Sequence, residues 1–99
     1  MQQPPPNDEA PTPLSNVVKA RLKRQREFAA VNRDRFNTLS GREREVLTLI
    51  AQGHSNKAIS ETLAISIHTV RTHRNNIWKQ LNISSIVDAV WWGECFELI

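Results

Sequence analysis

The stretch between Glu61 and Asp88 contains no acidic residue, although the net charge of the whole chain is only +3. Opposite an apolar face, this stretch carries basic and amide side chains, namely Arg71, Arg74, Asn75, Asn76 and Lys79. Guanidinium and ammonium groups bind phosphate, and asparagine amides form hydrogen bonds with polar base edges. The pattern predicts a surface for a polyanion that also has hydrogen-bonding edges, and nucleic acid is a partner of this kind.

Residue types used in catalysis or metal binding also occur, but their spacing suits neither role. The three histidines and the single cysteine do not share a metal-ligand spacing. Ser40 and Ser55 have no histidine–carboxylate pattern beside them, so they are interpreted as helix caps and not as nucleophiles. Glu43 and Glu45 are two residues apart on a helix and therefore point in different directions. We predict no enzyme activity and no metal, cofactor or small-molecule site in this chain.

Composition limits the chain of 99 residues to one domain. Residues 1–13 hold all five prolines and no large apolar residue after Met1, a composition typical of a disordered tail. Cys95 is the only cysteine, and neither a signal peptide nor a membrane-length apolar run is present. We therefore expect a reduced, cytoplasmic protein that has no membrane contact.

Residues 14–37 are predicted to form a long, exposed, amphipathic helix, referred to below as the arm. The segment lacks glycine and proline, is rich in basic residues, and carries apolar residues at roughly helical spacing: Leu14, Val17, Val18, Leu22, Phe28, Val31 and Phe36. The arm can be a solvated helical linker. Alternatively, it pairs with a second copy or touches DNA phosphate.

Serine residues mark the starts of four further helices. Ser40 and Glu43 stand at the spacing of a capping box, in which each side chain bonds a free backbone N–H at the helix start. Gly53 and Asn82 tolerate the left-handed conformation that often ends a helix. These signals predict helices at about 41–52, 55–64, 66–82 and from Ser84 through Trp92.

The second and third of these helices are separated by a turn of about three residues, which is typical of a helix-turn-helix. In that motif the later helix enters the major groove, and the acid-free basic helix is the later one. The predicted fold class is all-α: a four-helix helix-turn-helix domain at residues 38–99, preceded by the arm.

The residues of this domain resemble the LuxR-type (GerE-like) DNA-binding domain. The resemblance rests on ordered motifs from about Thr38 to Ile99: Leu39-Ser-Gly-Arg-Glu-Arg-Glu-Val-Leu47, Ile50-Ala-Gln-Gly-His-Ser-Asn-Lys57, Ile65-Ser-Ile-His-Thr-Val-Arg-Thr-His73, Asn76-Ile77 and Asp88-Ala-Val90. Members of this family are bacterial transcription regulators that bind double-stranded DNA as dimers. The resemblance therefore implies sequence-specific DNA binding by a response-regulator output domain or a stand-alone regulator.

The resemblance also implies roles for individual positions. Arg71, Thr72 and Asn75 match base-facing positions of the helix at about 66–82, which is the recognition helix that enters the major groove. Arginine can bond guanine and asparagine can bond adenine, each through two hydrogen bonds. The positions that match phosphate contacts are Asn56, Lys57, Thr69, His73 and Lys79.

Four positions depart from the family pattern: Ala58, Asn82, Ile86 and Glu97 stand where the family usually or often has Glu, Gly, Arg and Gly. The loss of an arginine at Ile86 puts a phosphate contact there in doubt. None of the four changes abolishes the predicted fold.

The last helix matches the family's dimer contact. Val87, Val90 and Trp91 stand at the matching positions, which predicts a homodimer on DNA with a tryptophan in its interface. In the alternative, Trp91 and Trp92 both pack against the arm. Two alternatives to a DNA-binding regulator of this family are a protein-interaction module that uses the arm and the tryptophans, and a sigma-factor-like helix-turn-helix that acts with RNA polymerase.

Overall fold

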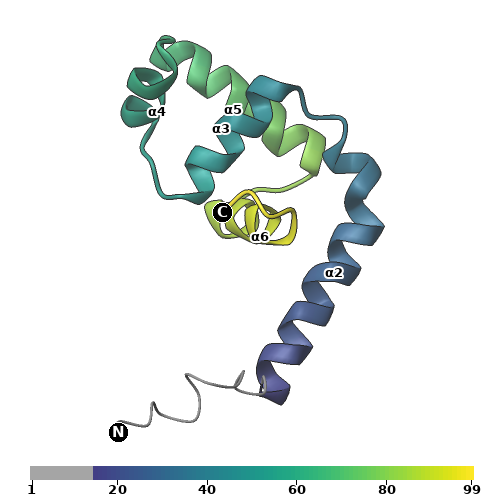
Figure 1. Ribbon diagram of the computed structural model, residues 1–99. Helices are drawn as coiled ribbons and strands as arrows, with labels where there is room; N and C mark the ends of the chain where they lie inside the picture. Colours follow the sequence, from purple (N-terminus) through teal and green to yellow (C-terminus); the bar gives the residue numbers. More distant parts are fainter. Residues whose placement is uncertain (1–14) are drawn as a thin grey trace, which may run out of the picture.

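The computed structural model describes residues 15–99, and the predicted proline-rich tail at 1–13 lies outside the described residues. Figure 1 shows that a long helix projects from a bundle of shorter ones. The helices are α2 (Asn16–Phe36), α3 (Gly41–Ala51), α4 (Asn56–Leu63), α5 (Ile67–Leu81) and α6 (Ile86–Cys95). Within residues 15–99 there is no strand, so the predicted all-α class is confirmed.

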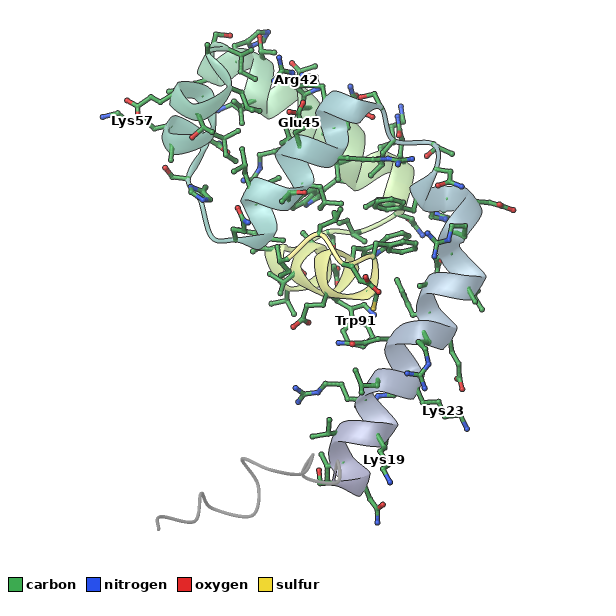
Figure 2. All side chains as sticks on the ribbon, in the orientation of Figure 1. Lys19, Lys23, Arg42, Glu45, Lys57 and Trp91 are labelled. Carbon is green, nitrogen blue, oxygen red and sulfur yellow. The ribbon has the colours of Figure 1, made fainter. Side chains whose placement is uncertain are left out.

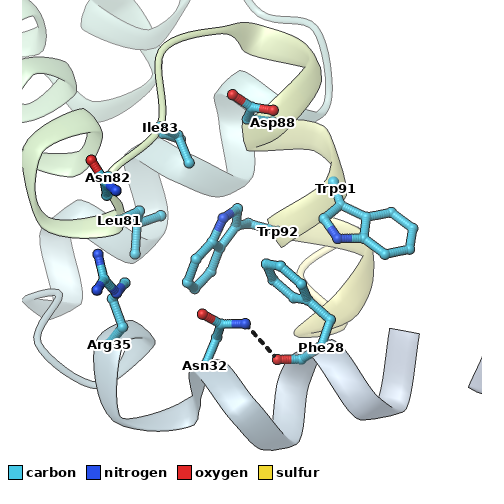
Figure 3. Close-up of a pocket in the computed structure, with 9 residues that line it drawn as sticks. All are labelled: Phe28, Asn32, Arg35, Leu81, Asn82, Ile83, Asp88, Trp91 and Trp92. Atoms are coloured by element: carbon cyan, nitrogen blue, oxygen red, sulfur yellow. Dashed lines mark hydrogen bonds between the residues drawn. The ribbon is translucent and has the colours of Figure 1, made fainter. Parts of the chain in front are cut away.

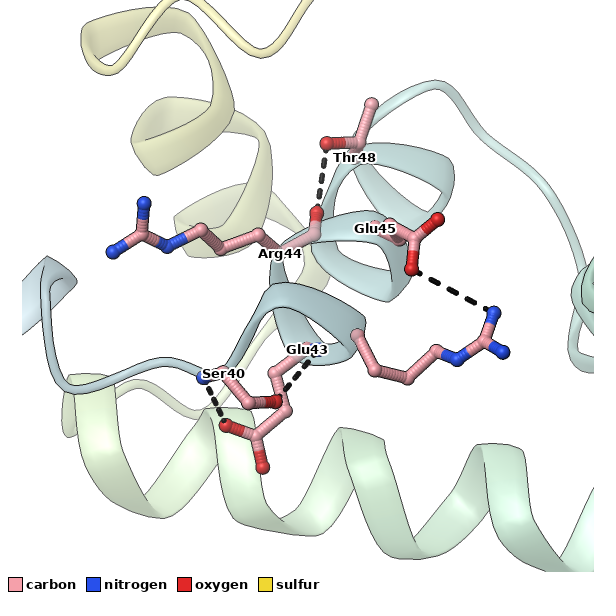
Figure 4. A network of polar contacts seen from close by, with 6 residues as sticks. Ser40, Glu43, Arg44, Glu45 and Thr48 are labelled. Atoms are coloured by element: carbon pink, nitrogen blue, oxygen red, sulfur yellow. Dashed lines mark hydrogen bonds and ion pairs between the residues drawn. The ribbon is translucent and has the colours of Figure 1, made fainter.

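Each of these helices begins after a serine whose hydroxyl accepts a hydrogen bond from a backbone N–H three residues later, a cap worth about 1 kcal/mol. The predicted capping box is present: Ser40 N–H donates to Glu43 Oε1 at 3.0 Å, and Glu43 N–H donates to Ser40 Oγ at 3.1 Å (Figure 4). The last helix starts one residue later than predicted. Ser85 is its cap, because Ser85 Oγ accepts from Asp88 N–H, whereas Ser84 N–H donates to the Asp88 carboxylate.

The helices α3, α4 and α5 each end in left-handed backbone. Gly53 has φ 92° after α3, and Asn82 has φ 54° after α5, as predicted. Ala64 has φ 54° after α4, where the sequence offers no glycine or asparagine. This conformation at Ala64 turns the chain from α4 into α5 within three residues.

The core lies between α3, α5 and α6, with α4 packed on α5. Its centre consists of side chains at most 3% exposed, which are Val46, Leu47, Ile50, Ile59, Val70, Ile77, Leu81, Ala89 and Trp92. In α5 the residues Val70, Ile77 and Leu81 recur on one side, since helical positions about 3.6 residues apart share a face. This packing holds α4 and α5 in a fixed relation.

The arm α2 is most deeply packed on the bundle in its second half, while Leu22 and Gln25 in its first half are only half-buried. Phe28 is half-buried, and Ala29 and Phe36 are buried, whereas Val17 and Val31 are 73% and 82% exposed. The predicted apolar stripe of the arm is therefore wrong at Val17 and Val31. No helix of residues 15–99 covers those two side chains, so their helical spacing does not reflect a packed face.

Five aromatic rings join α2 to α6 and to the C-terminal residues. This aromatic cluster consists of Phe28, Phe36, Trp91, Trp92 and Phe96. Phe36 and Phe96 stack with centroids 4.2 Å apart, and Trp92 stacks on Phe96 at 5.4 Å. Arg44 lies over the Phe36 ring, at one end of the stack, and Arg33 lies over the Phe96 ring in its middle, so each of these two rings also has a cation–π contact. The cluster fixes the second half of the arm to the bundle.

The backbones of α3 and α6 approach closely at Gly93. A Cβ on Gly93 would lie 2.8 Å from Ala51 Cβ. Helix propensity alone would make Gly93→Ala stabilising by about 1 kcal/mol, but overpacking costs about 1–3 kcal/mol. We therefore expect Gly93→Ala to lower the thermal unfolding midpoint, measured by circular dichroism.

Gly41→Ala is the matched control, because Gly41 is also helical and has no atom within 4 Å of the added Cβ. It should leave the midpoint unchanged or raise it. The double variant Gly93→Ala/Ala51→Gly should recover stability lost through the clash. A stabilised Gly93→Ala would contradict the close approach.

None of the helices within residues 15–99 is both long enough and apolar enough to cross a lipid bilayer.

Candidate nucleic-acid interface

The two helices α4 and α5 and the turn between them position the predicted DNA-contacting side chains. Ser66 caps α5 and also accepts or donates a hydrogen bond with the Thr69 hydroxyl at 2.9 Å. Because Val70, Ile77 and Leu81 face the core, the opposite side of α5 faces solvent. Side chains of α5 that contact a binding partner must therefore lie on that outer side.

The three predicted base-reading residues lie together on this outer side. Arg71, Thr72 and Asn75 are all exposed, and at helical spacing Asn75 lies between the other two. Thr72 Oγ1 donates to the carbonyl of His68 at 3.2 Å, so its hydroxyl can still accept a hydrogen bond and its methyl group can make an apolar contact. One surface thus offers a guanidinium, an amide and a methyl group.

The five predicted phosphate-contacting residues differ in their surroundings. Lys57 and Lys79 are exposed, and Figure 2 shows Lys57 extending outward from α4. Asn56, Thr69 and His73 are half-buried. The Nδ1 atom of His73 is buried without a hydrogen-bond partner, so a phosphate contact by this ring would have to use Nε2. Thr69 already shares its hydroxyl with Ser66.

Arg74 connects the two helices of the motif, a role that the sequence pattern did not reveal. Its Nη1 donates to Asn56 Oδ1 at 3.0 Å, and its guanidinium lies over the Trp78 ring at 5.1 Å from the centroid. The spacing of Arg74 and Trp78, four residues apart, is the one sequence signal that could have indicated this packing. Arg74 is half-buried, unlike its neighbours Arg71 and Asn75.

The positive charge of the chain is concentrated on the arm and not on the helix-turn-helix. Residues 37–99 contain six basic and six acidic side chains, whereas α2 contains seven basic and two acidic ones. Figure 2 shows Lys19 and Lys23 on α2, far from Lys57 on α4. No acid lies on α5 itself, and two of the acids within 37–99 are engaged elsewhere: Glu43 is buried in its capping box and Glu45 pairs with Arg42 at 3.6 Å (Figure 4). The basic character of α5 is therefore local.

The predicted dimer residues lie on α6. Val87 is 78% exposed, Val90 is half-buried, and the half-buried Trp91 ring meets Phe28 edge-on at 5.8 Å. Trp92 is buried and also meets Phe28, at 5.0 Å. Both tryptophans thus contact the arm, as the alternative interpretation predicted, while Val87 stays on the outer surface.

An open cleft of about 380 Å³ lies between α2, α6 and the end of α5 (Figure 3). Phe28, Trp91 and Trp92 form its apolar wall, and Asn32 donates a hydrogen bond to the Phe28 carbonyl at 2.9 Å beside it.

Cys95 is buried, and burial, with a smaller contribution from Glu94, raises the pKa of its thiol to about 11. This thiol is therefore protonated and unreactive at neutral pH.

The helices α4 and α5 are joined by a short turn, and the second of them has an exposed polar and basic face. This arrangement is that of a helix-turn-helix protein. A family model described as bacterial regulatory proteins, luxR family, matches residues 37–92, which is more than half of the chain. The chain belongs to this family, as the resemblance in the sequence predicted.

Individual relatives agree with this assignment. The oxygen regulatory protein NreC of Staphylococcus carnosus is 46% identical over 57 residues, which are 58% of this chain and 26% of the relative. The nitrate/nitrite response regulator proteins NarP and NarL of Escherichia coli are 44% identical over 66 residues and 42% identical over 79 residues. These matches cover 67% and 80% of this chain, and 31% and 35% of the relatives. The chain therefore spans about a quarter to a third of the length of these relatives.

Proposed function

We propose that this chain binds double-stranded DNA in a sequence-specific manner and supplies the DNA-binding domain of a bacterial transcription regulator. The observation that carries the proposal is the outer side of α5, where Arg71, Thr72 and Asn75 are exposed together on a helix held by buried residues on its other side. A rigid helix of this kind fits the width of the major groove, where each base pair presents a distinct pattern of donors and acceptors. The relatives with response-regulator names support the same function.

Phosphate contacts would set the position of α5 on the duplex. Lys57 lies on α4 and Lys79 on the last turn of α5, so two exposed cations come from both helices of the motif. Asn56, Thr69 and His73, which are half-buried, are assigned as weaker contacts. Neutralised phosphates release counterions, so the affinity should fall as the salt concentration rises.

The test of the proposed function is selection of bound sequences from a random duplex pool, followed by fluorescence-anisotropy titration of the enriched sequence. Enrichment of a defined motif with a salt-dependent affinity is expected. Binding without enrichment would leave only a non-specific basic surface. Absence of binding would favour a protein-interaction module.

We further propose that two copies pair on DNA through the outer side of α6, with Val87 at the centre and Val90 and Trp91 at its edges. Val87→Glu should abolish this pairing, because a carboxylate would be buried between two apolar surfaces. At 78% exposure the substitution should leave the unfolding midpoint unchanged. Sedimentation velocity with a palindromic duplex should show one copy per duplex where the unsubstituted chain shows two.

Val31→Glu on α2 is the matched control, since Val31 is 82% exposed and lies outside the proposed interface. It should assemble like the unsubstituted chain. Two copies per duplex for Val87→Glu would rule out pairing through α6. A loss of pairing for Val31→Glu instead would assign the contact to the arm. RNA polymerase is a further partner that this proposal allows and that neither variant tests.

A further inference from the structure

Arg74 makes the only hydrogen bond between side chains of α4 and α5 within residues 15–99. Its guanidinium is restrained from two directions, by the Trp78 ring within α5 and by Asn56 at the start of α4. An arginine that stacks on a ring and donates to an amide oxygen has a defined orientation, because its guanidinium is planar. The bond to Asn56 therefore has a fixed direction.

The amide of Asn56 has two chemically different ends, an acceptor Oδ1 and a donor Nδ2. Because Arg74 occupies Oδ1, the amide is turned so that the Nδ2 end remains for another partner. A phosphate oxygen accepts hydrogen bonds and cannot donate one at neutral pH, so only Nδ2 is suited to it. Without Arg74, the amide could rotate and present Oδ1, which would repel phosphate.

We propose that Arg74 is a positioning residue that orients the amide of Asn56 toward the DNA backbone and does not itself contact phosphate. The inference rests on the proposed function and adds to it an assignment for Arg74. It also explains why Arg74, although basic, is half-buried between the two helices while Lys79 on the same helix is exposed.

The test is a double-mutant cycle on DNA affinity with Arg74→Met and Asn56→Ala, because methionine keeps an unbranched apolar side chain over Trp78. Each single variant should bind the enriched duplex about tenfold more weakly, as expected for one lost hydrogen bond to a charged group. The double variant should also lose about tenfold, because both changes remove the same contact. Unfolding midpoints are measured alongside, so that affinities are compared between folded proteins.

The salt dependence separates positioning from direct phosphate contact. Lys79→Gln is the matched control on the same helix. It should reduce the slope of log affinity against log salt by about 0.9 and should add to Asn56→Ala. Arg74→Met should leave the slope unchanged. Asn56→Asp keeps the acceptor for Arg74 but removes the Nδ2 donor, so it should weaken binding by more than tenfold even if Arg74→Met fails to fold.

Two results would overturn the inference while leaving the proposed function intact. The first is an additive cycle, with about a hundredfold loss in the double variant. The second is a reduced salt slope for Arg74→Met, which would make Arg74 a direct phosphate contact. An unsubstituted chain that does not bind DNA would overturn the proposed function itself, and the inference with it.

Discussion

Trp92→Ala is expected to lower the free energy of unfolding by about 3–5 kcal/mol. Trp92 is 3% exposed, stacks on Phe96 at 5.4 Å and meets Phe28 edge-on at 5.0 Å. Its removal would leave a cavity at the point where α2, α6 and the C-terminal residues meet. For a domain of this size the midpoint should fall by roughly 4–8 °C per kcal/mol, which a thermal melt followed by circular dichroism would detect.

Trp91→Ala provides the control at the neighbouring position. The ring of Trp91 is only half-buried and contacts Phe28 alone among the aromatic cluster, so its loss should cost about 1–2 kcal/mol. Equal losses for the two variants would mean that Trp92 does not occupy the centre of the cluster. A larger loss for Trp91 would reverse the order of burial described above.

The double variant Arg71→Ala/Asn75→Ala should lose most of its preference for the selected DNA sequence. A bidentate contact between a side chain and a base contributes about 1–3 kcal/mol of discrimination, so two of them correspond to about 30-fold to 10⁴-fold. Both side chains are exposed, so the unfolding midpoint should not change. The measurement is anisotropy competition between the selected duplex and a scrambled duplex.

Asn76→Ala is the matched control for this prediction, because Asn76 is also exposed on α5 but is not assigned to a base. Its preference should stay within about twofold of that of the unsubstituted chain. If the double variant keeps its preference for the selected duplex, the assignment of bases to Arg71 and Asn75 is wrong. A uniform loss on both duplexes would mean that Arg71 contacts phosphate only.

The helices of the bundle could be predicted from the sequence because most of their boundaries depend on residues close to the helix ends. A serine before each helix, and Gly53 and Asn82 after α3 and α5, act within a few positions of the helix ends. The start of the last helix was predicted one residue too early, because two serines stand in tandem and either can cap, and its end was predicted at Trp92, three residues before Cys95. The left-handed Ala64 had no local signal, because neither glycine nor asparagine stands at the end of α4.

The packing of the arm could not be predicted in the same way. The apolar spacing in α2 includes Val17 and Val31, which nothing in residues 15–99 covers, and only the three-dimensional position of α6 decides which side of the arm is buried. The surroundings of Trp91 and Trp92 depend on the same contact. The excess of basic residues on the arm, by contrast, can be read directly from the sequence.

The predicted site residues fall into two groups, those whose position follows from helical spacing and those whose position depends on how two helices pack. Arg71, Thr72 and Asn75 lie on one exposed side because helical periodicity alone determines it, and the resemblance supplied their assignment. Their base contacts remain predictions. Arg74 was grouped with them by charge, but its bond to Asn56 spans 18 positions of the sequence and depends on how α4 crosses α5.

The close approach at Gly93 has a consequence for the geometry of a paired regulator. Because α6 lies so close to α3 there that even a Cβ on Gly93 would be 2.8 Å from Ala51 Cβ, we expect α6 to be held in one position on the bundle. If two copies pair through α6, the distance and rotation between their two α5 helices are then nearly invariant. Inserting one base pair between two recognition sequences rotates one of them by about a tenth of a turn relative to the other. A dimer of this chain should therefore tolerate changes in base sequence between its two sites far better than a change in the number of base pairs.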